Sequence, residues 1–275
     1  MLSTWILCSS GGETARDSQP HLGLEGYLMN MRDFQNAIHR KLLEHGWQVQ
    51  RAAPTPQGWE AHQAYWEPAY IRRLGFLAQT IIDVGVGHGT RRLYAAFPQA
   101  QLILVEPLAE HFQAITRLLE GRRGLHIRAA AWSCEGELEI RVEPSDPEGS
   151  SHYSRHPLEK SGDTLTPRRV PTTTIDRILA DHPFPEPFGL KIDTEGAELE
   201  VIRGATATLE RTEFVIAEVN VLRDRFEGSY SFAQFIAAMD QAGFEVCDLL
   251  GIGRCRSSTR VNYLDLLFQR RDIGS

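Results

Sequence analysis

The sequence has few cysteines, no long apolar run and no basic excess, and each absence excludes a class of protein. The four cysteines are scattered and form no CxxC pair, which argues against a disulfide framework or zinc knuckle and for reduced thiols in the cytoplasm. No apolar run reaches the ~20 residues that a membrane helix needs, so no membrane span is predicted. No basic residue precedes the short apolar stretch near the N-terminus, and a secretory signal peptide is therefore not expected.

The charge balance is acidic. Thirty-six acidic residues against 29 Lys and Arg give a formal net charge of −7, whereas proteins that hold long nucleic acids usually carry a basic excess. We therefore expect no nucleic-acid partner. The content of 42% hydrophobic and 24% charged residues is typical of a globular protein. A length of 275 residues allows one large domain, or one domain with an elaborated end.

Residues 1–75 are interpreted as an N-terminal helical extension, partly disordered, ahead of a main domain over residues 76–275. Apolar residues recur at helical spacing over residues 31–45, and a second helix is predicted over residues 68–78. The extension could cap the main domain or contribute to a homodimer, and the pattern does not choose between these roles.

From residue 80 onward, short apolar runs alternate with helical patterns. This alternation predicts βαβ units, and hence an α/β fold with a mostly parallel sheet and helices on both faces. The expected strands span residues 80–84, 101–105, 125–130, 188–192 and 214–219, and the expected helices span residues 91–97, 109–121, 198–209 and 232–242. Two final apolar runs, over residues 244–250 and 263–269, have too short a connection for a helix and should form an antiparallel hairpin.

Residues 143–169 interrupt this alternation and are interpreted as a lid-like insertion, because long loops in compact domains are usually functional or disordered. The insertion carries basic residues that could bind an anionic acceptor. A solvated charged loop is the alternative. These basic residues are Arg155, Lys160, Arg168 and Arg169.

A glycine-rich loop follows the first strand of the main domain, and an acid, Glu106, ends the next strand. Glycines permit a tight turn against which a ligand can lie, and an acid at this place can accept hydrogen bonds from a ribose. The spacing G-x-G-x-G, with an acid before it, favours S-adenosylmethionine over NAD, whose fingerprint is G-x-G-x-x-G. A tight turn without a ligand is the third possibility. The loop residues concerned are Asp83, Gly85, Gly87, Gly89 and Thr90.

A second cluster of ionisable residues, Lys191-Ile-Asp193-Thr-Glu195-Gly-Ala-Glu198, ends the fourth predicted strand. In open α/β sheets, ligands bind beyond such strand ends. The alternative is structural, because acids also stabilise the N-terminus of a helix.

These motifs together resemble the FkbM family of S-adenosylmethionine-dependent methyltransferases, over about residues 80–269. The resemblance rests on the two motifs above, on Val105-Glu106-Pro107, on residues 170–176 (VPTTTID) and on residues 201–205 (VIRGA). It implies a methyltransferase domain of the Rossmann-like class I type, with a mostly parallel seven-stranded sheet and a reversed last strand. It also implies methyl transfer to a hydroxyl oxygen of a small molecule, such as a sugar or secondary metabolite.

The resemblance also implies roles for individual residues. The glycine loop should hold the methionine part of the cofactor, with Asp83 near its ammonium group, and Glu106 should bind the ribose. Residues Ala131 and Trp132 lie where this class meets the adenine, and Trp132 could stack on it or be a core tryptophan.

Three kinds of group could help to remove the acceptor's proton. The first is a carboxylate of Asp193, Glu195 or Glu198, of which Asp193 is favoured. The second is Mg²⁺, for which Asp193, Glu218 and Asn220 would supply oxygen ligands. The third is a histidine in or near the loops of the site, namely His88, His152 or His156, and of these His152 is counted among the candidate catalytic residues. Lys191 is expected to pair with a carboxylate such as Glu218.

Three other functions compete with this interpretation. The first is a base-directed nucleic-acid methyltransferase. Such enzymes carry an Asn/Asp-Pro-Pro-aromatic loop where this chain reads Asp193-Thr194-Glu195-Gly196, which argues against this function. A non-catalytic cofactor-binding subunit of a partner enzyme is a second rival, although the acid cluster argues against it. A NAD-dependent enzyme is the third.

Overall fold

The computed structural model describes residues 5–9, 47–51, 67–142, 147–155, 165–222, 225–254 and 260–271. The chain divides into two units, Met1–Gln57 and Gly58–Ser275. In the first unit, β1 (Trp5–Ser9) pairs antiparallel with β2 (Trp47–Arg51), and the sequence pattern predicts neither strand. The helix predicted over residues 31–45 lies outside the described residues.

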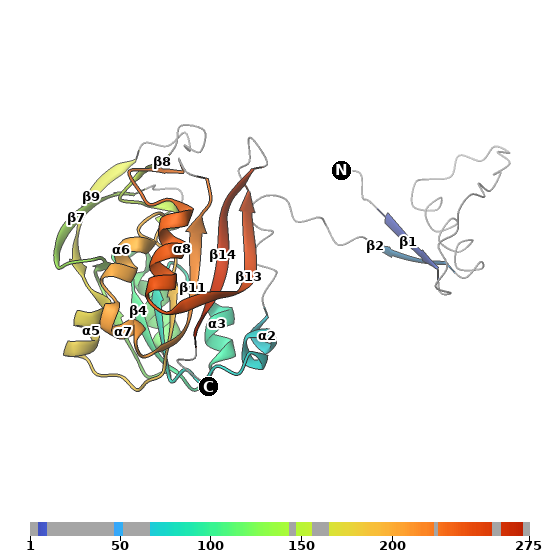
Figure 1. The fold of residues 1–275 in the computed structure, drawn as a ribbon, viewed down its shortest axis with the longest axis horizontal. Helices are drawn as coiled ribbons and strands as arrows, with labels where there is room; N and C mark the ends of the chain where they lie inside the picture. The colour runs from blue at the N-terminus through green and yellow to red at the C-terminus, as the bar shows by residue number, and fades with distance from the viewer. Residues whose placement is uncertain are drawn as a thin grey trace. The chain divides into compact units, whose positions relative to one another are not determined.

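The second unit is built on a seven-stranded sheet with the order β13–β14–β11–β10–β3–β4–β5 (Figure 1). Its strands are β3 (Thr80–Val84), β4 (Gln101–Val105), β5 (Gly124–Ile127), β10 (Phe188–Ile192), β11 (Thr212–Asn220), β13 (Phe244–Arg254) and β14 (Val261–Arg270). Neighbouring strands run parallel from β11 to β5, whereas β14 is antiparallel to both of its neighbours. The predicted Rossmann-like class I methyltransferase sheet and its C-terminal hairpin are therefore confirmed.

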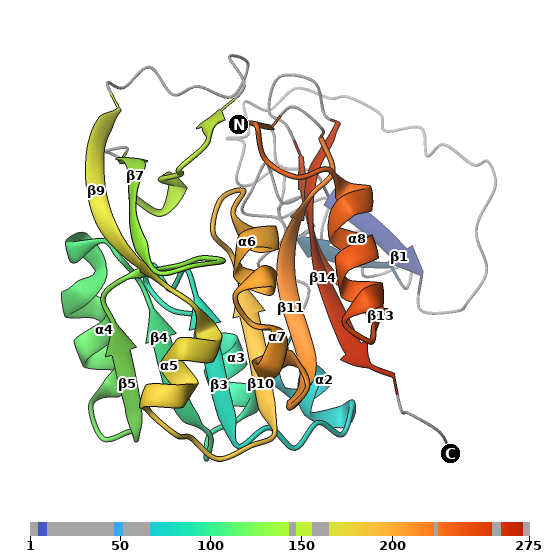
Figure 2. The same cartoon turned by 60° about the vertical axis from the view of Figure 1, so that its left-hand side comes forward.

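Helices cover both faces of this sheet, as predicted (Figure 2). One face packs against α5 (Ile175–Asp181), α6 (Glu198–Arg203), α7 (Thr206–Leu209) and α8 (Phe232–Gln241). The other face packs against α2 (Pro68–Arg73), α3 (Arg91–Ala96) and α4 (Phe112–Leu119), which follows the short 3₁₀ helix η2 (Ala109–His111). Strand β3 is buried on both sides, because Ile82 and Val84 enter the first core and Ile81 enters the second. This two-sided burial explains its continuous apolar sequence.

Two predicted helices differ from the structure, one by an interruption and one by an early end. The helix predicted over residues 198–209 is divided into α6 and α7 at Gly204, where an added Cβ would lie 2.0 Å from the carbonyl oxygen of Trp132. The helix predicted over residues 68–78 ends at Arg73, and Gly75 follows with a φ of +83°. Close backbone packing and a left-handed residue therefore set these ends.

A three-stranded sheet with the order β6–β9–β7 stands between β5 and α5 in the chain (Figure 2). Its strands are β6 (Ala130–Ala131), β7 (Gly136–Val142) and β9 (Thr166–Thr173). The insertion predicted over residues 143–169 connects β7 with β9 and contains η3 (Pro147–Gly149) and β8 (Ser154–Arg155), which pairs with β12 (Phe226–Glu227). Residues 166–169 belong to β9, so the last part of the predicted loop is a strand.

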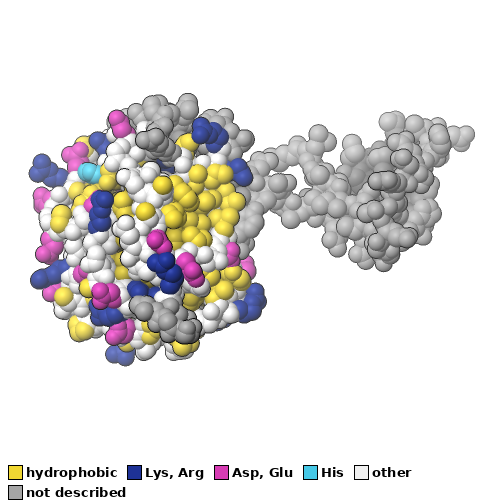
Figure 3. Space-filling model, viewed as in Figure 1, with side chains coloured by type: hydrophobic (Ala, Val, Ile, Leu, Met, Phe, Trp, Pro, Cys, Tyr) yellow, Lys and Arg dark blue, Asp and Glu magenta, His cyan; other side chains and the backbone are white. Residues whose placement is uncertain are grey.

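The face drawn in Figure 3 carries scattered charged side chains and a gathering of apolar ones over β13 and β14. Among the large apolar side chains, Val246 and Leu249 of β13 are 50% and 44% exposed. None of the helices in the described part of the chain has the length and hydropathy that a membrane crossing requires.

Candidate functional site

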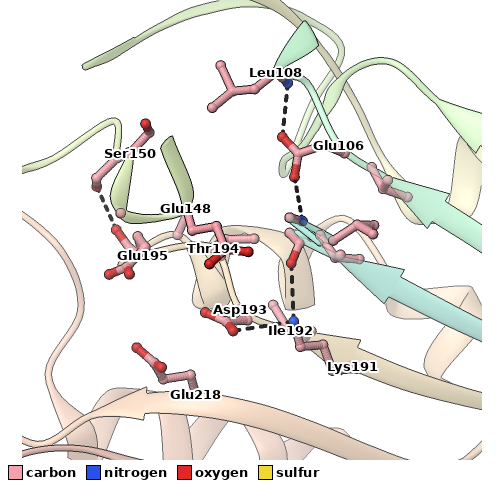
Figure 4. A pocket seen from close by; sticks show the side chains of 18 of the residues that line it. Glu106, Leu108, Glu148, Ser150, Lys191, Ile192, Asp193, Thr194, Glu195 and Glu218 are labelled. Atoms are coloured by element: carbon pink, nitrogen blue, oxygen red, sulfur yellow. Dashed lines mark hydrogen bonds and ion pairs between the residues drawn. The ribbon is translucent and has the colours of Figure 1, made fainter. Parts of the chain in front are cut away.

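A cavity of about 970 Å³ lies at the carboxyl ends of the parallel strands, between the glycine loop, the loop after β10 and the described part of the insertion. The predicted site residues on its wall are Gly85, Gly87, Gly89, Thr90, Glu106, Ala131, Trp132, His152, Asp193, Glu195 and Glu218. Sequence elements far apart in the chain thus meet around one space, part of which is drawn in Figure 4.

The glycine loop is left-handed at each of its glycines, with φ values of +73° at Gly85, +50° at Gly87 and +92° at Gly89. These values favour glycine, because a Cβ strains this conformation. The loop also packs closely, since a Cβ on Gly85 would lie 1.7 Å from the carbonyl oxygen of Asp193. The two sequence motifs are therefore in direct backbone contact.

Glu106 follows β4 and is 5% exposed. Its carboxylate accepts hydrogen bonds from the backbone N–H groups of Gly87, at 3.1 Å, and Leu108, at 2.9 Å (Figure 4). Each carboxylate oxygen has a second lone pair for a further donor. Burial raises the pKa of Glu106, and the two N–H donors oppose this effect. Glu106 thus fixes the glycine loop and can still receive hydroxyl donors.

Lys191 connects the two motifs through their acids, but not through the partner that the sequence suggests. Its Nζ lies 3.4 Å from Asp83 and 3.3 Å from Asp193, and it donates to the carbonyl oxygen of Gly85 at 3.1 Å. The expectation that Lys191 pairs with a carboxylate is confirmed, but its partners are Asp83 and Asp193 rather than Glu218, because the register of β10 on β3 places Lys191 opposite Asp83. Burial lowers the pKa of Lys191, but the charges of Asp193 and Asp83 raise it by more than burial lowers it. The net pKa lies above its ordinary value, so the lysine is a cation.

Asp83 does not reach the cavity wall. Its side chain is fully buried, accepts a hydrogen bond from the hydroxyl of Tyr94 and lies beside Lys191. A side chain buried in this way does not contact a ligand in the cavity, so the predicted contact between Asp83 and the cofactor's ammonium group is not formed. Asp83 instead holds Lys191 and α3 in place.

Glu198 has a structural place at the start of α6. One carboxylate oxygen accepts from the backbone N–H groups of Thr194 and Gly196, and the other accepts from the hydroxyl of Tyr230 at 2.7 Å. Burial raises its pKa, although these donors lower it. The carboxylate faces the loop of residues 194–196 rather than the cavity, which matches the structural alternative for this acid and not the predicted catalytic role.

Arg225 occupies the place where the sequence predicts a metal ion. Its guanidinium contacts Glu218 at 2.6 Å, Asn220 at 2.9 Å and Glu195 at 2.8 Å, and its side chain is only 7% exposed. The predicted Mg²⁺ site at Asp193, Glu218 and Asn220 is therefore not formed. In the part of the chain that the structure describes, no group of three or more His, Cys, Asp or Glu side chains is arranged to hold a metal ion. The guanidinium supplies the positive charge that a metal ion would otherwise supply.

Three carboxylates stand in a row across neighbouring strands. Ile192 of β10 pairs with Ala217 of β11, so the residues that follow them, Asp193 and Glu218, lie side by side (Figure 4). Glu218 is in turn opposite Asp265 of β14, and all three acids line the cavity.

The three carboxylates of this row differ in whether a Lys or Arg forms an ion pair with them. Lys191 contacts Asp193 and Arg225 contacts Glu218, whereas no Lys or Arg of the described residues forms an ion pair with Asp265. Burial raises the pKa of Asp265 to about 7, and the negative charge of Asp193 adds to this effect. Burial also raises the pKa of Glu218 well above its ordinary value, against the attraction of Arg225.

His152 lies on the cavity wall near Trp132, with ring centroids 5.3 Å apart in an edge-to-face arrangement. Its Nδ1 is 2.7 Å from the carbonyl oxygen of Glu139. Because a carbonyl only accepts, Nδ1 carries the proton and Nε2 is the acceptor in the neutral ring.

The insertion contacts both motifs. Glu148 accepts hydrogen bonds from the backbone and ring nitrogens of His88 in the glycine loop, at 3.1 and 2.6 Å. On the other side, the Ser151 hydroxyl donates to the carbonyl oxygen of Glu195 at 2.6 Å, and Arg155 lies 3.4 Å from the Glu195 carboxylate. Of the basic residues suggested for an anionic acceptor, Arg155 lines the cavity, Arg168 instead pairs with Glu110, and Lys160 lies outside the described residues.

Sequence reasoning missed Arg225, Asp265 and Tyr230. Arg225 belongs to none of the sequence motifs, and its partners become neighbours only in the folded sheet. The sequence does contain a signal for Asp265, because it is the one acid in the apolar run of β14, Val261–Arg270.

The known proteins similar to this chain include several methyltransferases. The hexuronic acid methyltransferase AglP of Haloferax volcanii is 27% identical over 140 residues, which cover 50% of this chain and 54% of that protein. The crystal structure of the methyltransferase FkbM from Methylobacillus flagellatus KT is 13% identical and covers 76% of this chain and 49% of that chain, with a TM-score of 0.45. This chain thus spans about half the length of both proteins. The magnesium protoporphyrin IX methyltransferase of Synechocystis, solved with bound S-adenosylmethionine, is 10% identical over 90% of this chain and 87% of that chain, with a TM-score of 0.39.

The model of the methyltransferase FkbM domain matches residues 83–246. This match covers more than half of the chain and includes the glycine loop, Glu106, the loop after β10 and most of the sheet. The chain therefore belongs to the methyltransferase FkbM family.

Proposed function

We propose that the protein transfers a methyl group from S-adenosylmethionine to a hydroxyl oxygen of a sugar-like small molecule, with a hexuronic acid as the favoured acceptor. The observation that carries this proposal is the shared cavity: the glycine loop and Glu106 form one part of its wall, and the carboxylates of Asp193, Glu218 and Asp265 form another. A cofactor and an acceptor could therefore meet within one space.

The first part of the wall fits an adenosine-bearing cofactor. The left-handed glycine loop leaves its backbone open to a ligand, Glu106 keeps acceptor capacity for two ribose hydroxyls, and Trp132 offers an aromatic face for the adenine. When bound, S-adenosylmethionine supplies an activated methyl group on a sulfonium centre. The chain's own residues then need only to orient the acceptor and accept its proton.

The second part of the wall fits an acceptor rich in hydroxyl groups. Ionised carboxylates only accept hydrogen bonds, and sugar hydroxyls are donors that match them. Asp193, held by Lys191 at 3.3 Å, is placed to orient such a hydroxyl next to the glycine loop. The related AglP is a hexuronic acid methyltransferase, which supports a hexuronic acid in particular.

A hexuronic acid also carries a carboxylate, which needs a cation. Arg155 stands on the cavity wall, where its guanidinium lies 3.4 Å from the Glu195 carboxylate and donates to the carbonyl oxygen of Gly149 at 2.6 Å. A guanidinium has five N–H donors, so Arg155 could also bind the carboxylate of such an acceptor.

Calorimetry with the full chain tests the cofactor assignment. We expect S-adenosylmethionine and S-adenosylhomocysteine to bind and NAD⁺ to give no heat of binding. Tighter binding of NAD⁺, or no binding of either sulfur compound, would refute the proposed function.

A further inference from the structure

We infer that Asp265 is a catalytic residue that accepts the proton of the acceptor hydroxyl during methyl transfer. The inference rests on the proposed function and deepens it by naming the base. It starts from the row of carboxylates that β10, β11 and β14 present to the cavity, in which each acid has a different environment.

Asp193 and Glu218 each already contact a cation. Lys191 lies 3.3 Å from Asp193, and the Arg225 guanidinium lies 2.6 Å from Glu218. Although burial raises the pKa of Glu218, a proton added to its carboxylate would compete with the hydrogen bond and ion pair that Arg225 already makes there. Glu195 is in the same position, since Arg225 and Arg155 both contact it.

Asp265 has the opposite environment. Burial raises its pKa to about 7 and the charge of Asp193 adds to this effect, whereas the charges of Lys191 and Arg225 oppose it. Neither of these two cations forms an ion pair with Asp265. A general base works best with a pKa near the working pH. Asp265 is the member of the row with which no Lys or Arg of the described residues forms an ion pair, so its carboxylate is available to take the acceptor's proton.

The roles along the row then follow. Asp193 orients the acceptor, and the acceptor's hydroxyl proton moves to a carboxylate oxygen of Asp265. As the O–H bond breaks, the acceptor oxygen forms a bond to the methyl carbon. The bond from that carbon to sulfur breaks, and its electron pair stays on sulfur, which becomes a neutral thioether. The products are the methyl ether, the thioether and a protonated Asp265.

His152 is the rival base on the same wall, because its Nε2 is free to accept a proton in the tautomer set by Glu139. A histidine also titrates near neutral pH, so a pH profile of the wild type alone cannot separate the two. Variants of both residues are therefore needed.

The test measures methyl transfer to methyl β-D-glucuronide and methyl β-D-glucopyranoside as a function of pH. We expect Asp265→Asn to lower kcat by 100-fold or more and to abolish the acid limb near pH 7, with the affinity for S-adenosylhomocysteine unchanged. His152→Gln should keep the acid limb. Asp248→Asn on β13, outside the cavity wall, serves as the matched control and should behave as wild type. A kcat of Asp265→Asn within threefold of wild type, or an acid limb lost only in His152→Gln, would overturn the inference.

A second measurement does not depend on turnover. Carbon-13 NMR of the side-chain carboxyls, in the full chain with S-adenosylhomocysteine, should show one aspartate that titrates near pH 7 and disappears in Asp265→Asn. If Asp265 titrates below about pH 5, the inference fails even when methyl transfer is observed. If neither acceptor is methylated, the proposed acceptor class fails, and the titration still decides the character of Asp265.

Discussion

Gly85 packs directly on the backbone of Asp193, so that a Cβ on Gly85 would lie 1.7 Å from the Asp193 carbonyl oxygen. The contact joins the glycine loop after β3 to the acidic loop after β10, and the N–H of Asp193 donates to the carbonyl oxygen of Val84 at 3.0 Å. The part of the cavity assigned to the cofactor and the part assigned to the acceptor therefore share one piece of backbone.

This contact predicts that Gly85→Ala displaces the loop and weakens binding of S-adenosylhomocysteine at least tenfold, about 1.4 kcal/mol. Gly121 is the matched control, because its φ of +71° is close to the +73° of Gly85 but an added Cβ would meet nothing within 4 Å. Gly121→Ala should cost only the ~1–2 kcal/mol of stability of a left-handed alanine and leave binding unchanged. Calorimetry of both variants checks this, and equal affinities would contradict it.

Glu106 is predicted to bind the ribose. Glu106→Gln retains the shape of the side chain but replaces one acceptor oxygen by a donor, so we expect at least a tenfold loss of affinity for S-adenosylhomocysteine, about 1.4 kcal/mol. Glu110→Gln, on the exposed side of η2 where Glu110 pairs with Arg168, should bind as wild type. An affinity of Glu106→Gln within twofold of wild type would remove Glu106 from the ribose site.

Arg225 is predicted to be essential to stability, because it neutralises buried Glu218 and half-buried Glu195. Arg225→Met leaves these charges without their cation and should lower the free energy of unfolding by about 3–5 kcal/mol. Arg271→Met, which breaks an exposed pair with Asp240, should cost less than about 1 kcal/mol. Urea unfolding at pH 7 measures both values, and similar losses in the two variants would be inconsistent with a buried charge cluster.

The raised pKa of Asp265 predicts a pH-dependent gain of stability in Asp265→Asn. The folded protein holds this proton up to about pH 7, whereas the unfolded chain releases it near pH 4. Folding therefore loses stability as the pH rises between these values. The full shift corresponds to about 4 kcal/mol, and with solvent screening in the cavity we expect about 1 kcal/mol. Thermal unfolding of Asp265→Asn should show a higher Tm than wild type at pH 8 and no gain at pH 4. The same gain at both pH values would show that ionisation of Asp265 does not destabilise the folded protein, and would contradict a raised pKa.

Glu148 is predicted to hold the insertion against the glycine loop through His88. Glu148→Ala should release S-adenosylhomocysteine about two- to fivefold faster, as expected for an exposed pair worth up to about 1 kcal/mol. Glu137→Ala, on an exposed position of β7, controls for the loss of an acid. Stopped-flow dissociation measures the rates, and unchanged release from Glu148→Ala would show that the insertion is not a lid.

The main sheet could be predicted from the sequence because its strands are buried on both faces. The predicted bounds of β3, β4 and β10 agree with the structure residue by residue, since each is a continuous apolar run between turn residues. The sequence pattern does not predict strands β7 and β9, because they are half exposed and rich in charged residues and proline. Their formation depends on pairing with each other rather than on a local pattern.

The site could be predicted only where it is local in sequence. The glycine loop and Glu106 belong to a recognisable strand–turn–helix unit. The partners of Lys191 depend on the register of β10 against β3, which places Asp83 opposite the lysine. Arg225 reaches Glu218 only because of the turn that follows β11. Tertiary pairing, which no single sequence displays, therefore decided which acids face the cavity and which are neutralised.

The most direct test of the account is methyl transfer from S-adenosylmethionine with a deuterated methyl group to methyl β-D-glucuronide, with the product examined by mass spectrometry and NMR. The account predicts one labelled methyl group on a hydroxyl oxygen of the sugar, and its loss when Asp265 or Glu106 is replaced. Label on a nitrogen or carbon atom of another acceptor, or no label on any hydroxyl compound despite tight binding of the cofactor, would contradict it.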